Sequence, residues 1–462
     1  MKKPLFAALV AVLTVLPSTG MTQTSPPSEI DQVVKHAIES NPEVQSAWHV
    51  FRSAGRDVDE ARGGYYPTVD LVGRAARESR NYGVEENFSD ASGELTLTQS
   101  IFDGFFTRSE VERLSNAELV RYYELLDAAE RTALEALVAY QDVRRQRDLV
   151  DLARDNYQQH LDVQAQVQES TEAGVARGAD FQQIEARVAQ AESNLINETS
   201  NLHDVSARYR RIVGLPPADQ LDSDVLEDAV MAGDLEAALM RAYENNPSFR
   251  AALRDIESSR ATIDRERSAY LPSLDLNASY GVDNRTDLGA RDTRREARIG
   301  VELRVNLFNG GSDRAATESA VEQLSAAQSQ RDIACRNIRQ TMEIAYNDVG
   351  KLAEQMEVLN KYRLSGDRVR VAYRDQFQIG QRTLLDVLDS ENEFFQAARS
   401  YVNAQVDHQI AIAEALTAGG QLLDAVDVRR DGLPGLSDLG AAPLPVDGQS
   451  ACPGGNQMMV DR

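Results

Sequence analysis

The chain carries one sequence pattern twice, and this duplication limits its fold more than any other feature. The pentapeptide AYQDV at Ala139–Val143 returns as AYNDV at Ala345–Val349, 206 residues later. An Asn-Pro pair begins at Asn41 in the first copy and at Asn246 in the second. Repeats of this kind set the architecture, so we expect two equivalent halves instead of a series of unrelated domains.

Each copy contains two segments with the period of a β-strand. In Ile299–Leu307 apolar residues alternate with glycine and polar residues, so one face is apolar and the other is polar. About ten such residues have the length of a strand that crosses a membrane. Polar loops are expected between the strands of each pair, at about 78–92 and 282–296. The strands are expected at about 68–77, 93–102, 273–282 and 297–307.

The rest of each copy has a helical period. Ile338, Met342, Ala345, Val349 and Leu352 are spaced alternately four and three residues apart, which is typical of a coiled-coil seam. The helix that contains them is nearly 70 residues and so about 100 Å long, and it must pack along other helices because no single domain buries such a stripe.

Shorter helices are expected on both sides of each long one. Helices of about 23 residues precede the strands, at about 43–65 and 248–270, and end before a proline. Two further helices follow the turns expected at Gly174 and Gly380, and they end near residues 212 and 418. A helix of about 23 and one of about 35 residues together match the long helix, so we expect them to stack end to end along it.

The ends of the chain and the join between the copies differ from the repeated unit. Lys2 and Lys3, followed by an apolar run and small residues, are typical of a secretory signal peptide. Pro216 and Pro217 break the helix at the join. We expect a signal peptide at 1–20, a first repeat at 21–213, a linker at 214–233, a second repeat at 234–423 and a tail at 424–462. The linker is expected to be equatorial, that is, at the level where the stacked helices meet. The tail is expected to be either disordered or equatorial.

Composition excludes several classes of protein. The net charge of −24 comes from acidic and basic residues scattered along the chain, without the concentrated basic face that nucleic acid requires. The two cysteines, Cys335 and Cys452, give no disulfide framework, and we expect both to be incidental. After the signal peptide no apolar stretch has the length of a membrane helix, so any membrane role must use strands or partners.

Enzymatic function is not expected. The five histidines are scattered, and no H-E-x-x-H, P-loop or G-x-S-x-G motif occurs. Asp386 and Asp389 would need a walled pocket to act as a hydrolytic pair, and the edge of a coiled coil provides none. No cofactor is therefore expected. A periplasmic coiled-coil scaffold remains as a distant alternative that would share the heptads but would not need the strands.

Four amphipathic strands cannot close a barrel by themselves, because an open edge in lipid leaves backbone groups unpaired. Two chains would give eight strands, whose side chains nearly fill the interior, whereas three chains give twelve and leave a lumen. The strand pattern therefore favours an assembly of several copies.

The duplication, the Asn-Pro pairs, the Tyr-Pro and Leu-Pro pairs before the strands, and the segment GQRTLLDVLDSE at Gly380–Glu391 resemble the TolC family of outer-membrane efflux ducts over about residues 30–423. The resemblance implies a mainly α fold with membrane β: the duplicated helix–strand–strand–helix unit forms a trimeric 12-stranded β-barrel continued by a 12-helix coiled-coil tunnel. It also implies a homotrimer in the outer membrane and its lipid, extending into the periplasm of a Gram-negative cell.

The partners implied by this resemblance are a periplasmic adaptor protein and an inner-membrane ABC transporter or proton-driven pump. The opening NPEVQSAWHVF at Asn41–Phe51 and the missing lipid-anchor cysteine are most similar to the type I secretion branch of the family. We therefore expect export of protein cargo such as a large adhesin. The duct of a multidrug efflux pump is the alternative.

The resemblance also assigns site residues by motif position. Asp386 and Asp389 match an acidic ring at the tunnel constriction, where cation binding is expected. In a trimer they become six carboxylates in a narrow ring. Arg382 matches the arginine of the periplasmic gate, and Asp180 matches its partner on the turn of the first copy.

Two positions depart from the family pattern. Phe377 stands where the family has a gate tyrosine and lacks its hydroxyl, and Ala179 replaces a threonine. The closed gate is therefore expected to depend either on pairing of Arg382 with Asp180 or on other residues.

Overall fold

The computed structural model describes residues 26–81, 85–175, 177–222, 226, 233–287, 290–446 and 452. The expected signal peptide at 1–20 and part of the expected linker lie outside this range. The first copy contains α1 (Ile30–Ser40), α2 (Pro42–Arg62), the short 3-10 helix η1 (Gly63–Tyr65), β1 (Thr68–Asn81), β2 (Glu85–Phe102), α3 (Phe106–Glu172) and α4 (Gly178–Val213). The second contains α5 (Leu235–Asn245), α6 (Pro247–Arg267), η3 (Ser268–Tyr270), β3 (Ser273–Asp287), β4 (Ala290–Arg304), α7 (Ser312–Gln378), α8 (Leu384–Ala418) and α9 (Leu422–Ala425).

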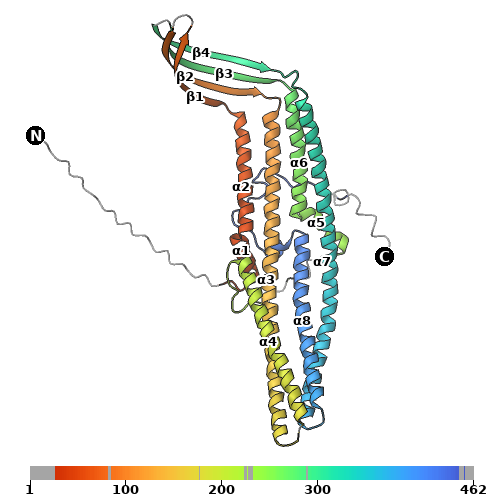
Figure 1. The fold of residues 1–462 in the computed structure, drawn as a ribbon. Helices are drawn as coiled ribbons and strands as arrows, with labels where there is room; N and C mark the ends of the chain where they lie inside the picture. The colour runs from red at the N-terminus through yellow and green to blue at the C-terminus, as the bar shows by residue number, and fades with distance from the viewer. Residues whose placement is uncertain are drawn as a thin grey trace, which may run out of the picture.

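Two helices of 67 residues each, α3 and α7, run the whole length of the helical part (Figure 1). The shorter helices α2 and α4 lie one above the other along α3, and α6 and α8 lie in the same way along α7. The expected end-to-end stacking is therefore confirmed. Contacts of α3 with α6 and α8 join the two copies. No helix in the described part of the chain is long and apolar enough to cross a membrane.

The repeated Asn-Pro pairs start the second helix of each copy. The side chain of Asn41 accepts a hydrogen bond from the main-chain N–H of Glu43 at 2.8 Å, and that of Asn246 accepts one from Phe249 at 3.2 Å. Proline occupies the first helical turn in both, where its missing N–H costs nothing. The pair therefore separates the short helix before it from the longer helix after it.

A glycine at each turn closes the hairpins at the tip of the helices. Gly174 follows α3 with φ of 76°, and Gly380 follows α7 with φ of 77°. This left-handed conformation strains any residue with a Cβ atom, so glycine ends both long helices at the equivalent position.

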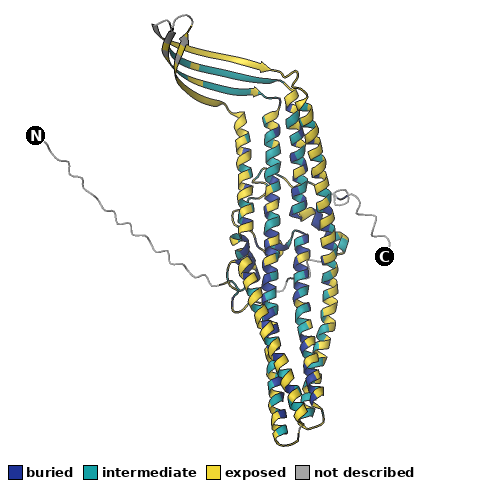
Figure 2. Ribbon diagram, viewed as in Figure 1, coloured by how far each residue is buried: buried dark blue, intermediate teal, exposed yellow. Residues whose placement is uncertain are grey.

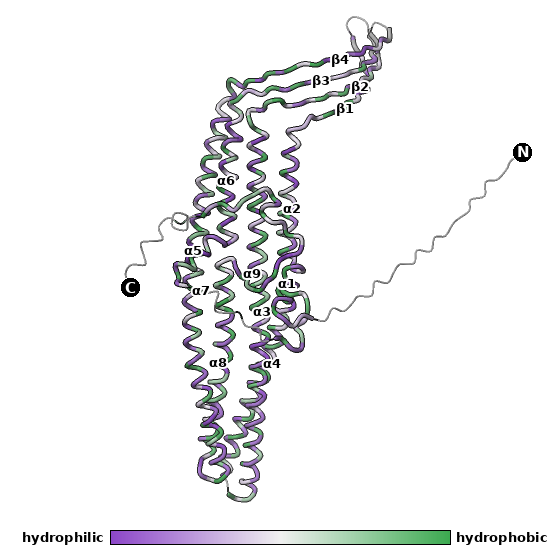
Figure 3. The backbone as a smooth tube through the Cα atoms, turned by 180° about the vertical axis from the view of Figure 1, so that it is seen from behind, coloured by the Kyte–Doolittle hydropathy of each residue, from purple (hydrophilic) through white to green (hydrophobic). Residues whose placement is uncertain are grey.

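The four strands form one antiparallel sheet in the order β1-β2-β3-β4. Leu71 pairs with Leu95, and Leu95 pairs in turn with Tyr280, so apolar residues line up across strands on one face. On β4 the apolar side chains Val301 and Leu303 are 61% and 66% exposed. Apolar and polar residues alternate along these strands (Figure 3). The apolar face is therefore not covered by this chain.

The strands are longer than the sequence indicates. Residues expected in polar loops at 78–92 and 282–296 belong largely to strands, because β1 continues to Asn81 and β2 begins at Glu85. Their pairing continues to Asn81 opposite Glu85 and to Asp287 opposite Ala290. The alternation fades there because main-chain pairing needs no apolar face. Sequence periodicity shows only the part of a strand that has one.

The main hydrophobic core lies where the upper and lower helices meet, and we call this level the equator (Figure 2). Tyr140 on α3 is fully buried there, and its hydroxyl lies 2.8 Å from the carbonyl oxygens of both Ser28 and Asp222. These residues precede α1 and follow α4, so one phenol anchors both ends of the first copy.

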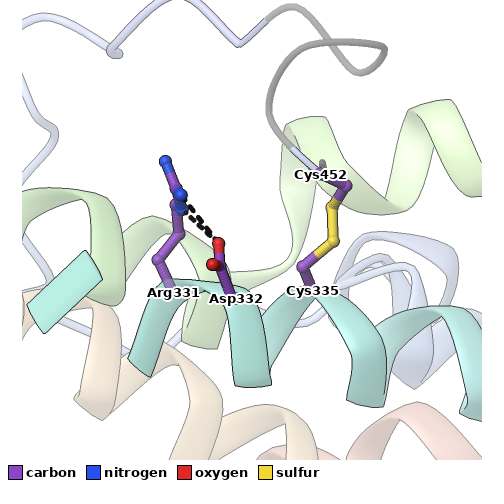
Figure 4. Close-up of a disulfide and its surroundings, with 4 residues drawn as sticks. All are labelled: Arg331, Asp332, Cys335 and Cys452. Atoms are coloured by element: carbon purple, nitrogen blue, oxygen red, sulfur yellow. Dashed lines mark hydrogen bonds and ion pairs between the residues drawn. A yellow bond between two sulfur atoms is a disulfide. The ribbon is translucent and has the colours of Figure 1, made fainter. Parts of the chain in front are cut away.

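The prediction that the two cysteines are incidental is wrong. Cys335 on α7 forms a disulfide with Cys452 in the tail, and both residues are almost completely buried (Figure 4). Their Cα atoms lie 5.9 Å apart although 117 positions separate them in the sequence. The pairing was missed because it depends on the tail folding back onto α7. A cross-link that closes so long a loop stabilises a folded chain by about 4–5 kcal/mol in the chain-entropy model.

A buried carboxyl group lies in the equatorial core. Glu130 on α3 is 4% exposed, accepts a hydrogen bond from the main-chain N–H of Leu423 at 3.4 Å, and has no described partner for its Oε2. Burial disfavours the charged form and raises the pKa of Glu130 from 4.5 to about 8. The contribution of Glu130 to folding stability is therefore fully present below pH 4.5 and is lost as the pH rises towards 8.

We expect Glu130→Gln to flatten the fall in stability between pH 5 and pH 9, because the amide is neutral but keeps an acceptor for Leu423. At pH 9 the variant should be more stable than the parent by at least about 1.4 kcal/mol, the equivalent of one pKa unit. Thermal unfolding at several pH values measures this. Glu135→Gln, at an exposed position of the same helix, is the control. Parallel pH profiles for the parent and Glu130→Gln would contradict the assignment.

Candidate gate at the tip of the helices

The tip of the helical part is built from the α3–α4 and α7–α8 turns, and a cavity of about 700 Å³ lies between them. Asp180, Phe377 and Arg382, the three residues assigned to the gate, all line this cavity. The turns that carry them are more than 200 positions apart in the sequence. The structure thus brings the predicted gate residues into one place.

Arg382 is held by its own hairpin. Its Nε donates a hydrogen bond to Oε1 of Gln376 at 2.9 Å, and its guanidinium lies 4.1 Å from the centre of the Tyr373 ring. A guanidinium at this distance from an aromatic face is attracted by the ring. Among the described residues of one chain, Arg382 is held by contacts within α7 and its turn and forms no ion pair with Asp180, so that pairing stays a prediction.

Asp180 and Asp386 occupy equivalent positions as caps of the helices after the turns. Asp386 accepts hydrogen bonds from the hydroxyl of Thr383 at 2.8 Å and from its main-chain N–H at 3.1 Å. These bonds lower the pKa of the Asp386 carboxyl below its ordinary value and keep it charged. Among the residues that the structure describes, Asp180 accepts one longer bond, from the N–H of Arg177 at 3.4 Å. The charged cap is therefore better held in the second copy.

Asp389 lies one turn after Asp386 on the same face of α8. Its Oδ1 is 3.7 Å from the guanidinium of Arg187 on α4, across the join between the two copies. Both side chains are partly exposed, so this ion pair contributes little to stability. It does link the acidic edge of α8 to the first hairpin.

Phe377 makes apolar contacts at the tip. It packs against a buried cluster contributed by α3, α4 and α8. The members of this cluster are Val163, Val167, Ile184, Leu384, Val387 and Leu388. Phe377 is partly buried and also lines the cavity, so its ring adds apolar surface to the wall of that cavity.

A second charged group above the tip was not predicted. Glu391 on α8 is 2% exposed and lies 2.9 Å from Arg374 and 3.4 Å from Arg370, both on α7. The ring of Phe394 lies 4.0 Å from the guanidinium of Arg370. Two arginines one helical turn apart, facing an antiparallel helix with a carboxylate, are the sequence signal that could have found it. Removing one partner of such a buried pair leaves an uncompensated charge, so it firmly joins α7 to α8.

Tyr373 and Gln376 were also missed. Both lie on α7 before the turn, and they contact Arg382 because its side chain points back from the turn towards α7. No local sequence pattern predicts that direction.

In the described part of the chain, no group of three or more histidine, cysteine, aspartate or glutamate side chains is arranged to hold a metal ion.

Comparison with known proteins agrees with this architecture. A family model described as outer membrane efflux protein matches residues 33–215 and 238–419, one segment in each copy. The chain is 24% identical to the outer membrane protein TolC of Escherichia coli (strain K12), over 90% of this chain and 86% of that protein. It is 23% identical to the alkaline protease secretion protein AprF of Pseudomonas aeruginosa, over 72% of this chain and 70% of that protein.

Solved structures share the fold. The crystal structure of the Campylobacter jejuni CmeC outer membrane channel matches with a TM-score of 0.77 at 14% identity, over 91% of this chain and 94% of that chain. TolC is described as an outer membrane protein and CmeC as an outer membrane channel. With most of both copies covered by the family model, the chain belongs to the outer membrane efflux protein family and is a TolC-like channel.

Proposed function

We propose that three copies of this outer-membrane efflux channel form the export duct of a type I secretion system. The observation that carries the proposal is the sheet: its apolar face is uncovered, and β1 and β4 are edges with no partner strand in the described part of the chain. Joining β1 of one copy to β4 of the next closes twelve strands, pairs every edge and leaves a lumen. A monomer in mild detergent, measured by light scattering after size-exclusion chromatography, would contradict this closure.

The family, and not the geometry, supports the partners that we propose. They are a periplasmic adaptor protein and an inner-membrane transporter, which would deliver cargo to the duct at the helical tip. The similarity to AprF, whose name describes protease secretion, supports protein cargo and an ABC transporter. The efflux description of the family supports the second candidate, export of small toxic compounds by a proton-driven pump.

Deleting the gene should abolish secretion of one or more large proteins, such as an adhesin, and leave the inhibitory concentrations of drugs and detergents nearly unchanged. Mass spectrometry of the culture medium and susceptibility assays measure the two outcomes side by side. Complementation with the intact gene is the control. Unchanged secretion together with increased drug sensitivity would replace the first candidate by the second.

We further propose that the tip is the gate of this duct. Arg382, held by Tyr373 and Gln376, supplies the polar contact, and Phe377 with the apolar cluster of α3, α4 and α8 supplies the seal. Threefold symmetry would gather Asp386 and Asp389 into a ring of six carboxylates. The lowered pKa of Asp386 keeps that residue charged at neutral pH, and the exposed ring would attract cations.

Arg382→Ser should raise the conductance of the resting channel in planar bilayers, because it removes the guanidinium that binds Gln376 and Tyr373. One lost hydrogen bond to a charged group is worth about a tenfold change in the ratio of open to closed channels. Arg368→Ser, at an exposed position of α7, controls for the loss of one positive charge. Equal resting conductance in both variants would remove Arg382 from the gate.

Asp386→Asn combined with Asp389→Asn should raise the concentration of a trivalent cation that blocks the channel by at least about tenfold, since six charges are removed from the constriction. Asparagine keeps an acceptor for Thr383 and so preserves the helix cap. Asp375→Asn, at an exposed position of α7, is the matched control. Unchanged block in the double variant would place the cation site elsewhere.

A further inference from the structure

The helical part has a mechanical weak point at the equator. There α2 begins above the end of α4, and α6 begins above the end of α8, so α3 and α7 are the helices of the described residues that continue through this level. The backbone at these joints turns tightly: a Cβ atom on Gly420 would lie 2.8 Å from the carbonyl oxygen of Asn245. Bending or sliding of the upper helices over the lower ones is resisted here by side-chain contacts instead of continuous helix.

The tail crosses this level and contacts the first copy. The guanidinium of Arg430 lies 4.9 Å from the centre of the Trp48 ring, and it donates a hydrogen bond to Oε1 of Gln45 at 3.2 Å. Both partners lie in the first turns of α2. Further along the tail, Leu433, Leu436 and Leu439 pack against the equatorial core.

The same tail then contacts the second copy. Arg250 on α6 donates a hydrogen bond to the carbonyl oxygen of Leu444 at 2.5 Å, and Arg254, one turn later, donates one to that of Ala442. Arg254 is 8% exposed. A guanidinium buried to this extent on a main-chain carbonyl holds the tail at a defined position.

At Cys452 the tail is joined covalently to α7. Cys452 is buried in a small core with Ala238, Tyr243 and Phe249, beside Cys335, and Figure 4 shows the disulfide joining the tail to the helix. The segment from Cys335 to Cys452 contains the lower part of α7, the gate turn, α8 and α9. The disulfide therefore closes a covalent ring that includes the whole hairpin carrying the gate.

We propose that residues 429–446 and Cys452 form a strap, locked by the disulfide, that fastens the first copy to the second across the equatorial joints. The strap continues from α8 and α9, contacts α2 through Arg430, and then contacts α6 before its disulfide to α7. Because α8 lies below the equator and α2 and α6 lie above it, the strap opposes separation of the upper helices from the lower ones. The gate hairpin then moves from an anchored upper end. This role does not depend on which cargo the duct exports or on which residues form its gate.

The lock is set during biogenesis. The thiolate of one cysteine attacks the disulfide of an oxidised thiol oxidoreductase and forms a mixed disulfide; the second thiolate then displaces the enzyme, which leaves as a dithiol. Two protons pass from the cysteines to that dithiol, so atoms and electrons balance. With both cysteines at 4% exposure or less, reductants have poor access once the chain has folded, and the bond acts as a fixed lock and not as a switch.

Hydrogen exchange in the full-length protein, purified in detergent, tests the strap. Cys452→Ser should increase exchange at least about tenfold in the first turns of α2 and α6, where the tail is attached, and leave the turn between α7 and α8 unchanged. Cys335→Ser should give the same pattern, and the double variant should be no worse than either single one. Native trypsin digestion should release the segment after Arg430 from the variants only, as seen on non-reducing gels.

Arg254→Met provides a second test that leaves the disulfide intact, because it removes the donor to Ala442 and keeps an apolar stem. It should increase exchange at the start of α6 and not at the start of α2. Alkylation should find no free thiol in the parent protein. Two reactive thiols in the folded parent, or unchanged exchange at both joints in the cysteine variants, would overturn the proposal.

Discussion

The structure depends on the burial of two apolar seams, each about 100 Å long, on α3 and α7. No single helix of the chain can cover such a seam, so two shorter helices are stacked along each long one. In the described part of the chain, this arrangement divides the molecule into upper and lower parts that have the helices α3 and α7 in common. The main hydrophobic core lies at the joint between these parts, the tail crosses it, and the hairpin of α7 and α8 extends below it.

The two copies are alike in backbone but differ in charge. Gly174 and Gly380 have the same left-handed conformation, yet only the second turn has a threonine and an aspartate that cap each other, and only the second hairpin carries the buried Glu391 with two arginines. The two turns therefore share their backbone shape and differ in their charged side chains. The second hairpin holds its arginine within itself, while the first contributes apolar side chains and a weaker cap.

Polar groups at the equator join segments that are distant in the sequence. The hydroxyl of Tyr140 lies between two main-chain carbonyl oxygens, and Glu130 accepts a hydrogen bond from a main-chain N–H of α9. Arginines of α6 donate hydrogen bonds to main-chain carbonyl oxygens of the tail, ahead of the disulfide. A long, thin molecule has little core per residue, which makes such specific links more important than in a compact domain.

The sequence alone determined the duplication, the order of helices and strands, the length of the rods and the family, because periodicity and repeats are properties of neighbouring residues. It also located Arg382, Asp386 and Phe377 at a turn. Only the tertiary structure decided that Arg382 turns back to Tyr373, that Asp389 faces Arg187, and that Cys335 meets Cys452. These contacts depend on how separate segments pack in space, and the sequence pattern around each residue contains no record of that packing.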